Sequence, residues 1–161
     1  MQNITFTDEG FIFPNEKINV DLAILKTVFV DNFPNSTTRK TLYNNYLRYI
    51  DDFSKQITPN FTQWINGSFV TLKENPNDID FVTFIDVDIY ERNKSEIDNF
   101  LSFSLEKEGL DAYILQIYPK YTEQYEEYTH FHLKNWEKRF SFARKNTRKE
   151  VFPKGFFEIN F

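Results

Sequence analysis

The sequence contains no cysteine, only four glycines and no long apolar run. The absence of cysteine excludes a disulfide framework and any zinc site built on thiolates. Residues 11–13 and 81–85 are among the most apolar stretches, and both are far shorter than the roughly 20 residues that span a bilayer. Residues 1–10 lack the basic and then apolar pattern of a secretion signal. We therefore expect a soluble, cytoplasmic protein without membrane contact.

The order of the predicted elements indicates the fold class. Apolar residues at three- and four-residue spacing predict helices, and short apolar runs between turn residues predict strands. We expect one α+β domain of 161 residues, with a small mixed β-sheet covered by helices. It would comprise a helical part (1–60), a core (61–118) and a C-terminal helix with a basic tail (119–161). The first predicted helix begins at Asn19 or Asp21. The other three run from Ser36 or Thr37 to about Ile57, from about Ser95 to Lys107 and from Thr122 to Arg139. The predicted strands are 4–6, 11–13, 81–85, 110–118 and 156–160, and we expect the last one at a sheet edge.

Residues 65–85 combine a Gly-Ser turn with two aspartates that lead into an apolar strand. Asp78 and Asp80 are two residues apart, so in a strand their side chains point to the same face. Two carboxylates this close repel each other unless a cation lies between them, and Mg²⁺ prefers oxygen ligands. Gly67 and Ser68 offer exposed amides and a hydroxyl that suit phosphate oxygens. The alternative interpretation is a solvated strand end that carries two surface acids.

This pattern resembles the signature of the DNA polymerase beta-like nucleotidyltransferase superfamily: a Gly-Ser turn, a gap of nine residues and a D-x-D strand. The resemblance implies the nucleotidyltransferase fold, with Gly67 and Ser68 on the triphosphate of the nucleotide. It also implies that Asp78 and Asp80 bind two metal ions, Mg²⁺ or Mn²⁺. The chain differs from the superfamily pattern because a second glycine between the two halves is missing and Pro76 stands in the linker.

The superfamily also has a third carboxylate on a neighbouring strand, and Asp111 follows Gly109 at the start of the predicted strand 110–118. By resemblance, one metal held by all three aspartates would activate an acceptor hydroxyl. The other metal, held by Asp78 and Asp80, would bridge the triphosphate. Asp111 is then the expected base or metal ligand. The alternative is an ordinary turn aspartate after a glycine.

Basic residues are concentrated near the C-terminus. Residues 134–154 contain eight lysines and arginines against two glutamates, whereas the whole chain carries a net charge of −5. This asymmetry indicates that the segment meets an anion: a triphosphate, an RNA or the acidic face of the same chain. We name Lys73 and Lys154 as charge partners of the nucleotide phosphates. The alternative is a solvated basic helix end.

The resemblance implies an enzyme that moves a nucleotide, expected to be AMP, from an NTP, expected to be ATP, to a protein or RNA hydroxyl. The overall layout resembles that of minimal single-domain bacterial nucleotidyltransferases of the antitoxin or defence type. That likeness implies a toxin–antitoxin or phage-defence role, with a partner protein encoded in the same operon. The rival hypothesis is a catalytically silent binding module of the same fold that acts by contact with a partner protein.

Two further features are interpreted as structural. Asp86 and Asp88 form a second acidic pair after an apolar strand, which also resembles the sugar-nucleotide site of some glycosyltransferases. However, Asp86 lies about 20 Å beyond Asp80 along an extended strand, too far to share one metal cluster. We therefore expect this pair to be the solvated far end of the strand. We expect His130 and His132 to be surface or packing residues.

Overall fold

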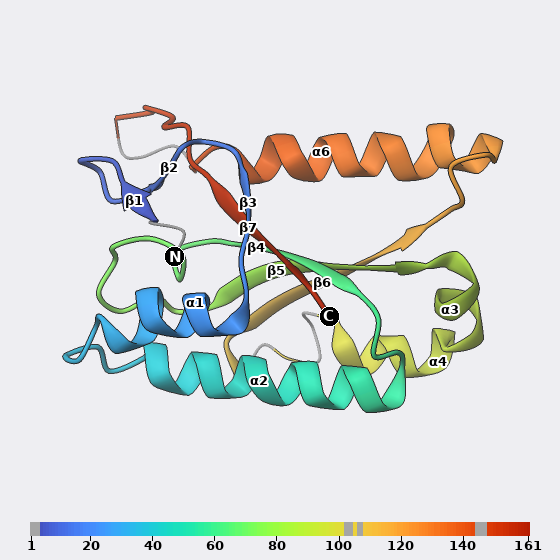
Figure 1. Ribbon diagram of the computed structural model, residues 1–161, viewed down its shortest axis with the longest axis horizontal. Helices are drawn as coiled ribbons and strands as arrows, with labels where there is room; N and C mark the ends of the chain where they lie inside the picture. Colours follow the sequence, from blue (N-terminus) through green and yellow to red (C-terminus); the bar gives the residue numbers. More distant parts are fainter. Residues whose placement is uncertain (1–3, 102–104, 106–107, 144–147) are drawn as a thin grey trace.

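A five-stranded mixed sheet forms the centre of the computed structural model, which describes residues 4–101, 105, 108–143 and 148–161. In spatial order its strands are β3 (Lys17–Asn19), β7 (Phe156–Asn160), β4 (Thr62–Asn66), β5 (Ile79–Asp86) and β6 (Leu110–Ile117) (Figure 1). β4 runs antiparallel to β5 and β7, whereas the pairs β5–β6 and β3–β7 are parallel. The predicted α+β class with a small mixed sheet is confirmed.

Helices cover both faces of this sheet (Figure 1). One face carries α1 (Leu22–Lys26), which continues as a π-helical turn (Thr27–Asp31), and the longer α2 (Arg39–Gln56). The other face carries α6 (Phe131–Phe140), which follows a π-helical turn (Tyr125–His130). Two short helices, α3 (Val87–Arg92) and α4 (Lys94–Ile97), and a 3₁₀ turn (Asp98–Phe100) follow the end of β5, and a small hairpin of β1 (Thr5–Phe6) and β2 (Ile12–Phe13) precedes β3.

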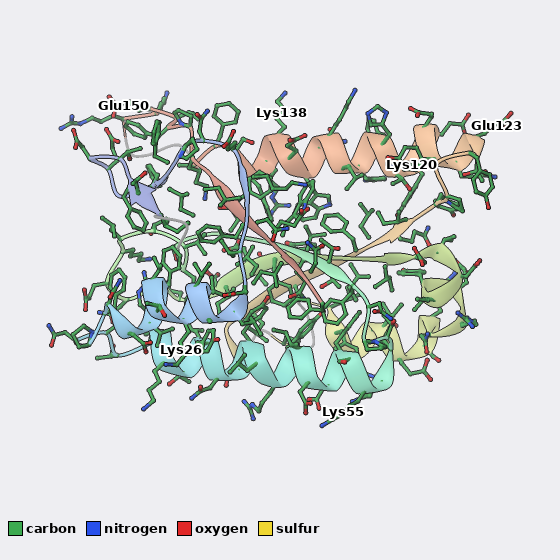
Figure 2. All side chains as sticks on the ribbon, viewed as in Figure 1. Lys26, Lys55, Lys120, Glu123, Lys138 and Glu150 are labelled. Atoms are coloured by element: carbon green, nitrogen blue, oxygen red, sulfur yellow. The ribbon has the colours of Figure 1, made fainter. Side chains whose placement is uncertain are left out.

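Charged side chains lie on the outward sides of these helices. Figure 2 shows Lys55 and Lys138 pointing away from the sheet on α2 and α6. Within the ranges described, no helix is both long enough and apolar enough to cross a membrane. The buried residues of α2 and α6, such as Tyr46 and Phe140, show that these two helices are amphipathic, with their apolar sides on the sheet.

The α2 side of the sheet is packed by tyrosine and phenylalanine rings. Tyr46 and Tyr49 meet the ring of Phe81 edge to face, at centroid distances of 5.3 and 4.8 Å. The Tyr46 hydroxyl also donates a hydrogen bond to Gln63, whose amide donates to Thr83 over 2.8 Å. Because these contacts join α2 to both β4 and β5, they fix the helix against the two strands that lead to the Gly-Ser turn and the aspartates.

The α6 side has a separate apolar layer. Trp64 packs on Phe84 and Phe156, at centroid distances of 4.7 and 5.2 Å, and Phe140 of α6 packs on Phe156 at 5.7 Å. Side chains alternate between the two layers along each strand, so Phe81 faces α2 while Val82 faces α6. The even-numbered residues of β4 and β5 therefore belong to the α6 side.

One arginine connects α2 to the linker between β4 and β5. Arg39 is 1% exposed, and its guanidinium donates hydrogen bonds to five backbone carbonyls. Burial lowers the pKa of Arg39 to about 10, partly offset by Glu74, so the group stays charged at neutral pH. A buried charge without such partners would be strongly destabilising. The accepting carbonyls belong to Phe29, Phe69, Thr71, Lys73 and Glu74.

Most local predictions are confirmed. The short strands at 4–6 and 11–13 form the β1–β2 hairpin, and Asp21 caps α1 by accepting a 2.7 Å hydrogen bond from the Ile24 amide. The predicted helices 36–57 and 122–139 and the strands 81–85 and 110–118 correspond to α2, to the π-helical turn with α6, and to β5 and β6. The predicted helix 95–107 is described only in part, because 102–104 and 106–107 lie outside the described residues.

Three predictions about the sheet are wrong. The tail strand, expected at an edge, is β7 in the sheet interior, where Phe157 is fully buried between β3 and β4. The edge position next to β7 belongs to β3, a three-residue strand at a place where no strand was predicted. The segment after Asp86 is the helix α3 instead of the end of a strand. The first two errors share a cause, since strand pairing is decided by contacts between segments far apart in the sequence.

Replacing Arg39 with methionine should strongly destabilise the protein, because several buried carbonyls lose their donor. We expect the free energy of unfolding to fall by at least about 3 kcal/mol, measured by urea denaturation. Arg48→Met is the matched control, since Arg48 lies on the same helix with its side chain 68% exposed. Equal, small losses in both variants would contradict this role for Arg39.

Candidate active site

The register of two parallel strands brings two of the predicted carboxylates together. Asp80 in β5 is the direct partner of Asp111 in β6, and neighbouring strands lie about 4.8 Å apart. Both side chains belong to the α6 side, by alternation with the flanking core residues. Asp78 immediately precedes β5, where the Ile79 amide donates to the Gly109 carbonyl over 2.9 Å. The three aspartates therefore start from the same end of the sheet.

The Gly-Ser turn lies against the same carboxylates. Asn66, the last residue of β4, pairs with Asp80, so Gly67 follows directly beside it. A Cβ atom on Gly67 would stand 1.6 Å from Asp80 Oδ2, which shows that the carboxylate lies over the glycine. Gly67 also has φ +80°, in the left-handed region that glycine favours. Only glycine at this position allows the turn and Asp80 to approach so closely.

The linker from Phe69 to Asn77 is held against the start of α2. Besides the Arg39 contacts, the Asn75 side chain accepts hydrogen bonds from the Thr37 amide at 2.8 Å and from the Ser36 hydroxyl at 3.1 Å. The Thr71 hydroxyl donates to the Ser68 carbonyl over 2.8 Å, which shapes the segment just after the turn. Lys73 is exposed on this linker, with its carbonyl bound by Arg39. These hydrogen bonds fix the path of the linker that contains Pro76.

Lys154 lies next to the end of α6. Its amide donates to the Ser141 carbonyl over 2.9 Å, while Asn66 Nδ2 donates to the neighbouring carbonyl of Phe140, also over 2.9 Å. Lys154 is only 8% exposed. The structure thus brings Lys154 and the Gly-Ser turn to the same end of α6. Of the other basic tail residues, Lys149 is exposed, and Arg144 and Lys145 lie outside the described residues.

The aspartate side chains do not form a ready metal cluster. Among the residues that the structure describes, no three His, Cys, Asp or Glu side chains are grouped so that they could hold a metal ion. The register aligns the backbones of Asp80 and Asp111, but the Asp80 carboxylate is turned over Gly67. Among the described residues, strand register therefore brings the backbones of the aspartates together, whereas their side chains are not arranged around a common point.

Asn66 is the site residue that sequence reasoning missed. It is 3% exposed, and its Oδ1 atom has no hydrogen-bond partner in the described part of the chain. The available signal was a polar residue at the end of an otherwise apolar approach, directly before Gly67. The two histidines are placed elsewhere: His130 contacts Glu126 at 2.7 Å, and the His132 ring packs on Tyr128 at 4.4 Å.

Comparison with known proteins gives a family assignment. Residues 4–160 match a family described as a family of unknown function, DUF6932. The chain belongs to the DUF6932 family. Comparisons with curated proteins and with solved structures found no match. The family covers almost the whole chain, so the turn, the aspartates and both covering layers all belong to the DUF6932 unit.

This DUF6932 chain has a second polar feature on the α6 side, at the opposite ends of β5 and β6. A groove of about 840 Å³ lies there, between α3 and the segment that leads to α6. Asp86 and Asp88 are exposed at this end, as expected, although Asp88 belongs to α3. The groove is lined by residues that include Lys17, Trp64, Asp86, Asp88, Lys120 and Glu158.

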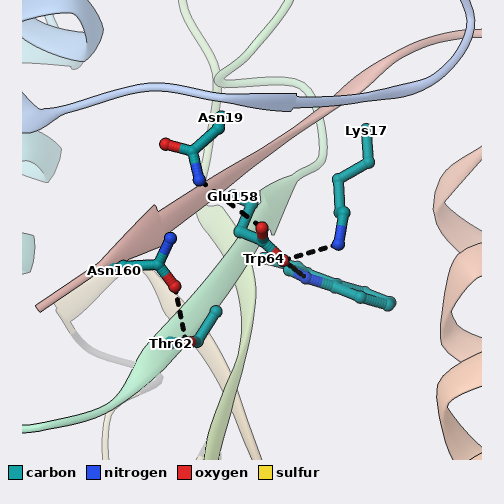
Figure 3. A network of polar contacts seen from close by, with 6 residues as sticks. All are labelled: Lys17, Asn19, Thr62, Trp64, Glu158 and Asn160. Carbon is teal, nitrogen blue, oxygen red and sulfur yellow. Dashed lines mark hydrogen bonds and ion pairs between the residues drawn. The ribbon is translucent and has the colours of Figure 1, made fainter.

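Glu158 is the centre of a polar network on the wall of the groove (Figure 3). Its carboxylate accepts hydrogen bonds from Lys17 Nζ at 2.7 Å, Trp64 Nε1 at 2.8 Å and Asn19 Nδ2 at 3.5 Å. Burial on its own would raise the pKa of Glu158, but these donors and the Lys17 charge outweigh it, so the pKa is lowered. The network joins β3, β7 and β4 and stabilises the ionised carboxylate.

Replacing Gly67 with alanine should displace Asp80 as well as strain the turn. We expect a larger loss of unfolding free energy in the wild-type background than in an Asp80→Ala background. In the second case only the cost of a positive φ remains, about 1–2 kcal/mol. Chemical denaturation of the four proteins in this double-mutant cycle measures the difference. Additive effects would show that Gly67 and Asp80 are not in contact.

The lowered pKa of Glu158 predicts an acid-sensitive contribution to stability. The folded state favours the ionised carboxylate, so the contribution is complete above the ordinary pKa of 4.5 and is lost as the pH falls through the folded pKa. Wild type should melt at a higher temperature than Glu158→Gln near neutral pH, and the gap should close in acid. Glu123→Gln, at an exposed site in Figure 2, is the control. A gap that stays constant with pH would refute the assignment.

Proposed function

We propose that this DUF6932 chain is a metal-dependent nucleotidyltransferase that moves AMP from ATP to a hydroxyl group of a protein or an RNA. One observation carries the proposal: the Asp80 carboxylate lies over Gly67 while Asp80 pairs in register with Asp111. A phosphate-binding turn and two carboxylates on adjacent strands are the parts that nucleotidyl transfer requires. The turn and the two carboxylates come from three separate stretches of sequence, and the pairing of β4, β5 and β6 brings them together.

The residues present fit a divalent cation in their chemistry. Asp78, Asp80 and Asp111 supply carboxylate oxygens from one end of the sheet, and Asn66 adds a buried amide oxygen without a partner in the described part of the chain. Such an all-oxygen set suits Mg²⁺ or Mn²⁺. When bound, the metal would neutralise charge on the triphosphate and lower the pKa of the acceptor hydroxyl. We assign the three aspartates to hold it.

The protein residues have separate roles in the proposed reaction. Gly67 and Ser68 bind the outer phosphates with backbone amides and a hydroxyl, in the turn next to Asp80. The acceptor oxygen forms a bond to the α-phosphorus as the bond from that phosphorus to the pyrophosphate oxygen breaks. Asp111 accepts the proton of the acceptor hydroxyl. We assign Lys154, whose amide binds the Ser141 carbonyl just after α6, to balance the phosphate charge.

A second candidate is a catalytically silent module of the same fold that acts by contact with a partner protein. The observation in its favour is that the described carboxylates are not grouped as a metal site. In either case the cellular context that we propose is a toxin–antitoxin or phage-defence pair, with the partner encoded in the same operon. The two candidates differ in whether the chain itself binds a nucleotide.

Calorimetric titration of ATP with Mg²⁺ or Mn²⁺ tests the enzyme proposal. Wild type should bind in a metal-dependent manner, and Asp78→Asn with Asp80→Asn should weaken binding at least about tenfold, because two ligand charges are lost. The matched control is Asp86→Asn with Asp88→Asn, the same charge change at the far end of β5. Binding that is lost equally in both double variants would reject the assigned site. Absence of binding in wild type would favour the silent module.

A further inference from the structure

Asn66 presents an unsatisfied acceptor beside the candidate carboxylates, and the following inference rests on the proposed function. Its side chain is 97% buried, and Oδ1 has no hydrogen-bond partner in the described part of the chain. Leaving a buried acceptor unpaired costs about 1–3 kcal/mol, and nearly all such groups in folded proteins are satisfied. An unpaired oxygen that also lies beside the candidate carboxylates is therefore a candidate ligand group.

The orientation of the Asn66 amide is determined by its other end. Nδ2 donates to the Phe140 carbonyl at the end of α6 over 2.9 Å. Rotating the amide by half a turn would place Oδ1 against that carbonyl oxygen, so two acceptors would repel each other. The acceptor is thus directed away from α6 and is not free to exchange places with the donor.

The surroundings of Asn66 decide what kind of ligand fits. Asn66 pairs with Asp80, and Asp80 pairs with Asp111, so three oxygen-bearing side chains stand in a row on β4, β5 and β6. They belong to the same side of the sheet. Ionised carboxylates only accept hydrogen bonds and cannot satisfy an amide oxygen. A divalent cation takes amide and carboxylate oxygens alike, so it suits the Asn66 oxygen in this position.

We infer that Asn66 Oδ1 is a direct ligand of the divalent cation held by the aspartates. Amide and carboxylate oxygens are common ligands of such ions. Asn66 also links the ion to the fold, because its amide nitrogen is fixed to α6 and its backbone leads straight into Gly67. The cation and the phosphate-binding turn are thereby positioned by adjacent residues of one strand.

Two Asn66 variants isolate the role of the oxygen. Both Asn66→Leu and Asn66→Asp lose the donor to Phe140, and Asn66→Asp also turns a carboxylate oxygen toward that carbonyl, but only Asn66→Asp keeps an oxygen for the cation. Mn²⁺ binding is measured by the electron paramagnetic resonance signal of the free ion, with no nucleotide present. We expect Asn66→Leu to bind Mn²⁺ at least about tenfold more weakly than wild type. Asn66→Asp should bind as tightly as wild type or more tightly, because it adds a negative charge.

A matched control uses another buried amide oxygen without a partner in the described residues, Gln116 Oε1 in β6. Gln116→Leu should leave Mn²⁺ affinity unchanged, since Gln116 alternates with Leu115 and belongs to the α2 side. Circular dichroism verifies that every variant is folded, and Asp80→Asn confirms that binding occurs at the aspartates.

The outcomes separate this inference from the proposed function. Wild-type affinity in Asn66→Leu, with binding lost in Asp80→Asn, would overturn the role of Asn66 and leave the aspartate site intact. Equal weakening in Asn66→Leu and Asn66→Asp would also overturn it, because the amide donor would then be responsible. A wild-type protein that binds no Mn²⁺ would overturn both the inference and the metal-dependent function.

Discussion

The buried Arg39 guanidinium is the contact on which the geometry of the candidate site depends. It binds four carbonyls within the linker between the Gly-Ser turn and the aspartates, from Phe69 to Glu74. These carbonyls are in a segment without regular structure, so no strand or helix satisfies them. A planar guanidinium with five N–H donors can bind all four at once, whereas a lysine ammonium has only three donors. The linker is thereby held to α2, and α2 is held to the sheet by Tyr46 and Tyr49.

The second constraint is the register between β4, β5 and β6. It places Asn66, Asp80 and Asp111 side by side, and a shift of one residue would move each side chain to the opposite face. The two apolar layers prevent such a shift, because Phe81 belongs under α2 and Val82 belongs under α6. The packing of the core therefore also fixes the position of the carboxylates, because both depend on the same strand register. The same alternation places the Glu158 network and the groove at the far end of the α6 side.

Sequence reasoning reached the parts of the site that depend on neighbours in the chain. It found Gly67 with Ser68, the Asp78 and Asp80 pair, and Asp111 behind Gly109, and the structure brings these stretches to one end of the sheet. It missed Asn66, because burial of its amide depends on the end of α6, which lies 74 positions further along the chain. It also missed the role of Arg39, since the acceptors of its guanidinium lie in other segments of the chain. The assignment to nucleotidyl transfer stays a proposal within the DUF6932 family.

The sequence by itself determined the local elements: the helical spacing of α2, the Asp21 cap, the glycine turn and the α+β class. These follow from interactions over a few residues, where periodicity and backbone preference decide. Only the tertiary structure decided that β7 lies inside the sheet, that β3 forms its edge and that Asp80 lies over Gly67. Each of these results from contacts between distant segments, and burial of shared apolar surface selects one pairing among several that the local pattern allows. The fold class could be predicted from the sequence, whereas the geometry of the site depends on tertiary packing.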